Sequence, residues 1–138
     1  DRIVVVDDEL ARSAWEQELY TLGLPPEIQT SFEDVATARE HVPAWIREPG
    51  RVVVLTRDVQ TMRRLAEGGL LRGQEVNIGG IHHAPGREGV LPYVYLSPEE
   101  RRELERLAQQ GVTVSARDLP GSRKVDLPHL LGRERPEP

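Results

Sequence analysis

The sequence contains no cysteine among its 138 residues. Disulfide bonds, thiolate catalysis and cysteine-ligated zinc are therefore excluded. Basic residues are also few: the sequence has 18 lysines and arginines and 23 acidic residues, which gives a net charge of −5. A general nucleic-acid binder needs a basic surface to replace the counterions on phosphates, so binding to nucleic acid is not expected.

Long apolar runs and several common motifs are missing as well. The longest apolar runs span a few residues, far short of the roughly 20 that cross a membrane. No G-x-G-x-x-G follows the first predicted strand, and no P-loop or G-x-S-x-G elbow is present. With no visible signal peptide either, a cytoplasmic location is expected. A composition of 38% hydrophobic and 30% charged residues is typical of a globular domain.

Short apolar runs indicate the fold. Ile3–Val6 and Arg51–Leu55 are rich in β-branched residues and typical of strands buried on both faces. Further strands are predicted at Glu27–Thr30, Leu91–Leu96 and Val112–Ser115. Because these strands alternate with helical patterns, we predict an α/β fold: a three-layer, mostly parallel open sheet with helices on both faces.

Helix starts are predicted from capping residues. Asp8 is expected to cap a helix from Glu9 to Leu22. Ser31-Phe-Glu-Asp34 resembles a capping box for the next helix, which Pro43 is expected to kink or end early. Ser97-Pro-Glu-Glu100 is the clearest start, with a serine cap, a proline at the first helical position and a glutamate that reaches back.

The chain length fits one domain, which we expect over residues 1–131. A single turn of helix is expected near Leu127–Leu131, and the Pro- and Arg-rich residues 132–138 are expected to form a disordered tail. The sequence opens at Asp1 and enters a buried strand at once. We therefore expect that an upstream segment is missing from it.

The stretch from Glu75 to Gly89 has the most distinctive chemistry. A short apolar run leads into Gly79-Gly80, then His82-His83 and Arg87. In open α/β sheets ligands bind beyond the carboxyl ends of strands, and glycine lets the backbone approach a ligand closely. The loop therefore suits an anion, although a tight turn with solvated histidines is the simpler interpretation of the residues alone.

The histidines do not form a predicted metal site. Adjacent side chains such as His82 and His83 usually point in different directions, so they are not expected to share one ion. His41 lies in a charged helical segment and His129 near the end of the chain, and both are interpreted as surface residues.

Four segments in register resemble a known family. They are Val5-Val-Asp-Asp-Glu-Leu-Ala11, Thr56–Gly69 with its Arg-Leu-Ala-Glu-Gly ending, Val76-Asn-Ile-Gly-Gly-Ile-His82 with Gly86-Arg87, and Leu107–Val114 with Arg117. Together they resemble the IIB component of the mannose/fructose/sorbose class of the sugar phosphotransferase system (PTS). The resemblance runs from about Asp1 to Leu127.

The resemblance implies a cytoplasmic phosphocarrier. In that family a histidine accepts a phosphoryl group from the phosphohistidine of a IIA domain. The group then passes to a sugar that arrives through the membrane components IIC and IID. An imidazole nitrogen is a nucleophile near neutral pH, and no cofactor or metal is implied. The resemblance leaves a homodimer open.

The sequence departs from the family at the acceptor. The family's carrier histidine lies in a segment like Asp-Asp-Arg-Leu-Ile-His-Gly-Gln, and no histidine follows Asp7-Asp8-Glu9-Leu10 here. We therefore expect no catalytic residue in this chain, and a phosphohistidine loop and strand upstream of it. The candidate residues of the surrounding pocket are Asp8, Thr56, Asn77, Gly79, Gly80, His82 and Arg87. Simpler roles remain for three of them: Thr56 as a helix cap, Asn77 as a strand-to-loop tie, and His82 facing solvent.

Two other functions stay open. The first is a non-catalytic regulatory or binding module that keeps a IIB-like fold and docks a IIA-like partner without turnover. The second is a small α/β hydrolase or mutase that uses Asp7 or Asp8, which would require a divalent metal.

Overall fold

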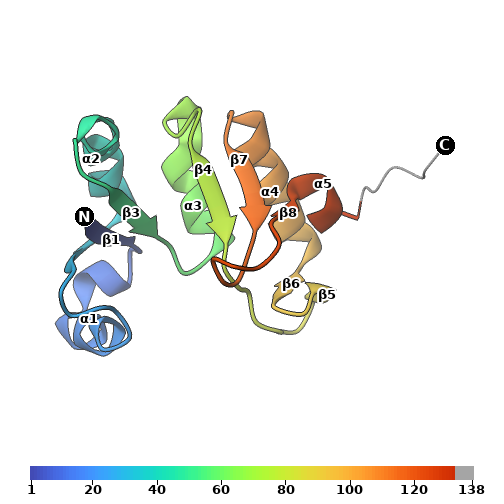
Figure 1. Cartoon of the computed structure of the whole chain (residues 1–138), viewed down its shortest axis with the longest axis horizontal. Helices are drawn as coiled ribbons and strands as arrows, with labels where there is room; N and C mark the ends of the chain where they lie inside the picture. Colours follow the sequence, from blue (N-terminus) through green and yellow to red (C-terminus); the bar gives the residue numbers. More distant parts are fainter. Residues whose placement is uncertain (133–138) are drawn as a thin grey trace. The chain divides into compact units, whose positions relative to one another are not determined.

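A computed structural model describes residues 1–132, in which helices alternate with mainly parallel strands (Figure 1). The chain divides into two compact units, Asp1–Leu70 and the part from Leu71 onward. The predicted α/β class is confirmed. Within the described residues, no helix is both long and apolar enough to cross a membrane. The tail predicted from residue 132 lies outside this range except for Gly132.

The first unit contains a three-stranded parallel sheet in the order β2-β1-β3. Its strands are β1 (Arg2–Val6), β2 (Gln29–Glu33) and β3 (Val52–Leu55). Val6 is paired with Glu33, and Val5 with Leu55. Because all three strands run in the same direction, their carboxyl ends lie on the same side of the sheet, and the residues that follow the strands lie there too.

Strand β1 forms the core of this unit. Val4, Val5 and Val6 are fully buried, as the run of β-branched residues predicts. Ile3 and Val5 cluster with Leu10 on one face, and four partly buried side chains pack against them: Tyr20, Ile28, Phe32 and Leu55. The prediction of full burial for the third strand is wrong, since Val53 of β3 is 39% exposed.

The predicted helix from Glu9 to Leu22 is interrupted. A short 3₁₀ turn, Leu10–Arg12, is followed by α1 (Ala14–Thr21). Ser13 separates them because its backbone is extended and its hydroxyl accepts a hydrogen bond from the Glu16 N–H. The side chain of Leu10 is buried, whereas Leu19 and Leu22 are exposed.

Helix α2 (Val35–Arg47) begins later than predicted. Its cap is Asp34, whose Oδ1 accepts from the Thr37 N–H at 2.7 Å, while Ser31 lies within β2. The pairing of β2 with β1 extends the strand to Glu33 and leaves no room for the predicted capping box. Pro43 does not end the helix. It lies on an exposed face, where water can hydrate the carbonyl that loses its N–H partner.

Helix α3 (Val59–Ala66) follows β3 and is capped by Asp58. It ends in a 3₁₀ turn over Glu67–Gly69. Gly68 and Gly69 both have positive φ, 73° and 79°, a conformation that side chains with a Cβ rarely adopt.

The second unit contains a three-stranded sheet in the order β4-β7-β8. Strand β4 (Glu75–Ile78) is parallel to β7 (Thr113–Ala116), and β8 (Val125–Asp126) is antiparallel to β7. Helices α4 (Pro98–Gln109) and α5 (Leu127–Leu130) both contact β7. The capping box of α4 and the single turn at α5 are confirmed.

The strand predicted at Leu91–Leu96 is in fact the second half of a hairpin. Strand β5 (Glu88–Leu91) pairs antiparallel with β6 (Val94–Leu96), and Pro92 and Tyr93 form the connection. Proline has no N–H to donate to a sheet, so it breaks the run at this point. Ile81 adds to the hairpin, because its N–H donates to Tyr93 O at 2.9 Å and its carbonyl accepts from the Tyr95 N–H at 3.0 Å.

Candidate functional site

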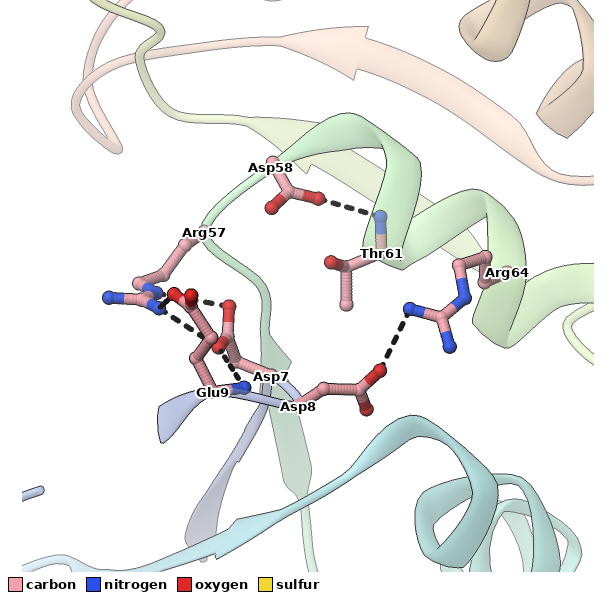
Figure 2. Close-up of a pocket in the computed structure, with 7 residues that line it drawn as sticks. All are labelled: Asp7, Asp8, Glu9, Arg57, Asp58, Thr61 and Arg64. Carbon is pink, nitrogen blue, oxygen red and sulfur yellow. Dashed lines mark hydrogen bonds and ion pairs between the residues drawn. The ribbon is translucent and has the colours of Figure 1, made fainter. Parts of the chain in front are cut away.

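An open pocket lies in the first unit where β1 and β3 end (Figure 2). Three of its side chains directly follow β1, two follow β3, and two come from α3. They are Asp7, Asp8 and Glu9, then Arg57 and Asp58, then Thr61 and Arg64. Ligands bind at these carboxyl ends of the strands in open parallel sheets.

Asp7 anchors one wall of the pocket. Its residue is 6% exposed, and its Oδ1 accepts from the N–H groups of Glu9 and Leu10, both at 3.0 Å. Arg57 donates to the same carboxylate through Nε at 3.0 Å and Nη2 at 2.9 Å. Such a two-point contact fixes the plane of the guanidinium as well as its position.

The electrostatics of this pair follow from the geometry. Burial raises the pKa of Asp7, but the hydrogen bonds from Arg57 and the Leu10 N–H outweigh it, so the net pKa lies below its ordinary value of 3.8. The hydrogen bond to Asp7 in turn raises the pKa of Arg57. Asp7 therefore remains an anion and holds a permanently charged guanidinium beside the pocket.

Asp8 connects β1 to two helices. Its Oδ1 accepts from the Val35 N–H at 2.9 Å, and its Oδ2 accepts from Nη1 of Arg64 at 3.0 Å. The hydrogen bond from Val35 and the Arg64 contact lower the pKa of Asp8. The prediction that Asp8 caps the helix directly after it is wrong, because Asp7 accepts those N–H groups and Asp8 reaches the start of α2.

The N-terminus of α3 forms the upper wall in Figure 2. Asp58 accepts from the Thr61 N–H at 2.7 Å. Thr61 is only 6% exposed, and its hydroxyl lies on the pocket side with no interaction drawn to the other six residues. A hydroxyl that faces a pocket can donate to or accept from a bound group.

Four carboxylates and two guanidinium groups line this pocket. Arg57 uses Nε and Nη2 toward Asp7, with Glu9 at 3.6 Å from Nη2, and its side chain is 37% exposed. Figure 2 shows its remaining nitrogen directed away from the carboxylates. Among the side chains that line the pocket, those that can donate to an anion are Arg57, Arg64 and Thr61, while the carboxylates keep the two arginines in place.

Two of the predicted site residues, Asp8 and Thr56, lie in the first unit. Asp8 lines the pocket. The Thr56 hydroxyl donates to the backbone carbonyl of Asp58 at 3.1 Å, and the cap of α3 is Asp58 rather than Thr56. Arg57, Thr61 and Arg64 are not among the residues predicted from the sequence. A guanidinium directly after a predicted strand, in Thr56-Arg57-Asp58, is the pattern from which Arg57 could have been found.

Three other predicted residues, Asn77, Gly79 and Gly80, lie where β4 ends in the second unit. Nδ2 of Asn77 donates to Arg117 O at 3.0 Å, so the strand-to-loop tie is confirmed. Neither glycine is among those with positive φ. A Cβ on Gly80 would make ordinary contact with Tyr93 O at 3.5 Å.

Arg87 has a complete set of partners within its own unit. Nε and Nη2 donate to the two oxygens of Glu100, at 3.0 and 2.9 Å, and Nη1 donates to His82 O at 2.9 Å. This guanidinium closes the loop from His82 onto the start of α4. The His82 residue is exposed, as its simpler interpretation predicts, and the His83 ring meets Tyr95 edge-on at 5.5 Å.

The hydrolase alternative would need a free carboxylate and a metal. Both oxygens of Asp7 are hydrogen-bonded, and Asp8 is bound by Val35 and Arg64. Within residues 1–132, no group of three or more His, Asp or Glu side chains is placed to hold a metal ion. The two carboxylates that this alternative would use are therefore both engaged in hydrogen bonds within the first unit.

Comparison with known proteins identifies the family. Residues 1–137 match the model of the PTS system sorbose subfamily IIB component. The chain is 28% identical over 136 residues to the N-acetylgalactosamine-specific phosphotransferase enzyme IIB component 1 of Escherichia coli (strain K12), which covers 91% of this chain and 79% of that protein. It is 27% identical over 134 residues to the PTS system mannose-specific EIIAB component of the same strain, covering 96% of this chain and 41% of that protein.

A solved structure supports the same assignment. The crystal structure of manxB from Thermoanaerobacter tengcongensis superimposes with a TM-score of 0.80 at 29% identity, covering 98% of this chain and 81% of that one. IIB components are phosphotransferase subunits that work with IIA and IIC/IID components. The chain belongs to the sorbose-subfamily IIB components of the PTS.

Proposed function

We propose that this chain belongs to a cytoplasmic phosphocarrier that takes a phosphoryl group from the phosphohistidine of a IIA domain. The carrier passes the group to a sugar during uptake through the IIC and IID membrane components. The match of residues 1–137 to the IIB family carries this proposal. The names of the relatives, which specify phosphotransferase components for sugars, support it.

The acceptor is proposed to be a histidine in the Asp-Asp-Arg-Leu-Ile-His-Gly-Gln-like segment that the family resemblance implies. None of the four histidines of this chain lies in such a segment. His41 is bound through Nδ1 to Glu33 at 2.7 Å. The role left for this chain is to surround the phosphoryl group and stabilise its charge during transfer.

The proposed pocket for the phosphoryl group is the one formed by Arg57, Thr61 and Arg64. Phosphoryl transfer relies on positioning and on charge stabilisation, and a guanidinium held in place provides both. Asp7 acts as the positioning residue for Arg57. The nearby carboxylates limit how tightly the group is held, which suits a carrier that must pass it on.

The other residues predicted for the site have different support. Asp8 positions Arg64 within this pocket. Asn77, Gly79, Gly80 and His82 remain proposed on the family resemblance alone. Thr56 and Arg87 are proposed as site residues on the same resemblance, although each side chain already has a hydrogen-bond partner in its own unit.

The experiment that tests this function measures the intact mass of the full-length gene product before and after incubation with a phosphorylated IIA partner. We expect a gain of one acid-labile phosphoryl group, which peptide mapping places on a histidine outside the four of this chain. A gain on His82 would contradict the proposed acceptor and place the phosphohistidine within this chain. No gain, while the IIA partner is demonstrably charged, would contradict the carrier function.

A further inference from the structure

The outer face of α1 is apolar and unusually exposed. Trp15, Leu19 and Leu22 are 69%, 50% and 82% exposed, and α1 contains no buried residue. Their spacing of four and three residues places the three side chains on one face of the helix. Clusters of large exposed apolar side chains on a protein surface mark interaction sites.

This apolar face points away from the helix's own unit. On the other side of α1, Tyr20 meets Phe32 edge-on with ring centroids 6.1 Å apart, and Nε2 of Gln17 donates to Leu10 O at 2.9 Å. These contacts fix the rotation of the helix. Burial of Trp15, Leu19 and Leu22 therefore requires something other than the core of the first unit.

The chain around this face is acidic on balance, although Arg12 precedes α1, His41 is bonded to Glu33 and Arg57 interacts with Glu16. Between Ser13 and Ala38 the sequence has no lysine, arginine or histidine, but it has five carboxylates: Glu16, Glu18, Glu27, Glu33 and Asp34. An anionic lipid surface would be repelled by them. A second copy of the chain, with its net charge of −5, is also a poor electrostatic match. The charge pattern favours a basic protein surface.

We propose that the Trp15–Leu19–Leu22 face docks onto the basic cytoplasmic surface of the IIC/IID membrane components. Cytoplasmic loops of membrane proteins carry an excess of lysine and arginine, which complements this acidic border. The apolar side chains fill a groove between those loops, and Trp15 is the central anchor. The choice of partner rests on the proposed function, whereas the docking face rests on the exposed residues and their charges.

The test measures binding of the full-length gene product to its IIC/IID components in nanodiscs, with single substitutions on the face. We expect Trp15→Ser and Leu22→Ser to weaken binding by about tenfold or more each. Ile46→Ser is the matched control, because Ile46 is 49% exposed, about as much as Leu19, but lies on α2. We expect Ile46→Ser to leave the affinity unchanged. Glu16→Gln with Glu18→Gln should weaken binding and reduce its salt dependence.

Phosphoryl acceptance from IIA, measured on the same variants, separates the two proposals. If the variants accept the phosphoryl group normally and lose only docking, both proposals stand. If the wild-type protein accepts no phosphoryl group, the proposed carrier function is contradicted whatever the docking result. Equal binding of wild type and Leu22→Ser overturns the docking face. Three other results would also overturn it, because each assigns another occupant to the face. Binding to protein-free anionic nanodiscs assigns lipid, and self-association that Leu22→Ser abolishes assigns a second copy. A Trp15 that resists quenching by acrylamide in the full-length protein assigns another part of the same protein.

Discussion

Replacing Arg57 by alanine should slow phosphoryl transfer from IIA to the full-length protein by about 10²–10³-fold. Arg57 is the guanidinium that Asp7 fixes at two points beside the pocket, at 2.9 and 3.0 Å. Loss of this cation leaves the phosphoryl group beside four carboxylates with only Arg64 to balance them. Rapid-quench measurement of the transfer rate, with IIA in excess, gives the effect directly.

Lysine at position 57 should recover only part of the rate. An ammonium retains the charge but cannot make the two-point contact with Asp7, so its position is not fixed. Asp7→Asn should also slow transfer, because it leaves Arg57 charged but loosens it. Arg47→Ala is the control, because the Arg47 side chain donates to Pro43 O of its own helix and does not line the pocket. An Arg57→Ala rate within threefold of wild type, in a protein that unfolds normally, would remove Arg57 from the site.

Replacing Glu100 by alanine should lower the free energy of unfolding by about 2–4 kcal/mol. Glu100 is 3% exposed and accepts from the Ser97 N–H at 2.9 Å as well as from Arg87. Its loss breaks the capping box of α4 and frees Arg87 from its partner. Glu99 is the matched control, since it stands next to Glu100 in the first turn but is exposed; Glu99→Ala should cost about 0.5 kcal/mol or less.

The pH dependence of this effect has a defined sign. Burial raises the pKa of Glu100, but the Ser97 N–H and Arg87 outweigh it, so the net pKa lies below the ordinary value of 4.5. The stabilisation is therefore complete above about that pH and is lost as the pH falls through the folded-state pKa. Urea unfolding of wild type and Glu100→Gln should converge in acid. A difference that stays constant down to acid unfolding would contradict this assignment.

The features that were predicted correctly are local ones. The β-branched run of β1 and the Ser97–Glu100 capping box each lie within a few residues, and the structure has both. Local patterns failed where pairing decided the outcome. Ser31 is part of β2 because that strand pairs with β1. Pro92 interrupts a predicted strand, and the residues around it form a hairpin.

The site depends on contacts that no local pattern encodes. Asp7 and Arg57 are 50 residues apart in sequence, and Asp8 bonds to Arg64 across 56 residues. A charged residue after a strand is ordinarily a surface residue or a helix cap, so the sequence alone does not single out Arg57. The family resemblance rests on four segments spread from Val5 to Arg117, and the match of residues 1–137 to the family model confirms it.

The most direct test of the carrier function follows the phosphoryl group to its destination. Full-length protein is charged by labelled phospho-IIA, separated from it and mixed with IIC/IID membranes and candidate sugars. We expect the label to leave the protein and appear on one sugar within the lifetime of the phosphohistidine. A protein that becomes charged, binds those membranes and yet keeps its label with every sugar would contradict the carrier function and favour the regulatory module.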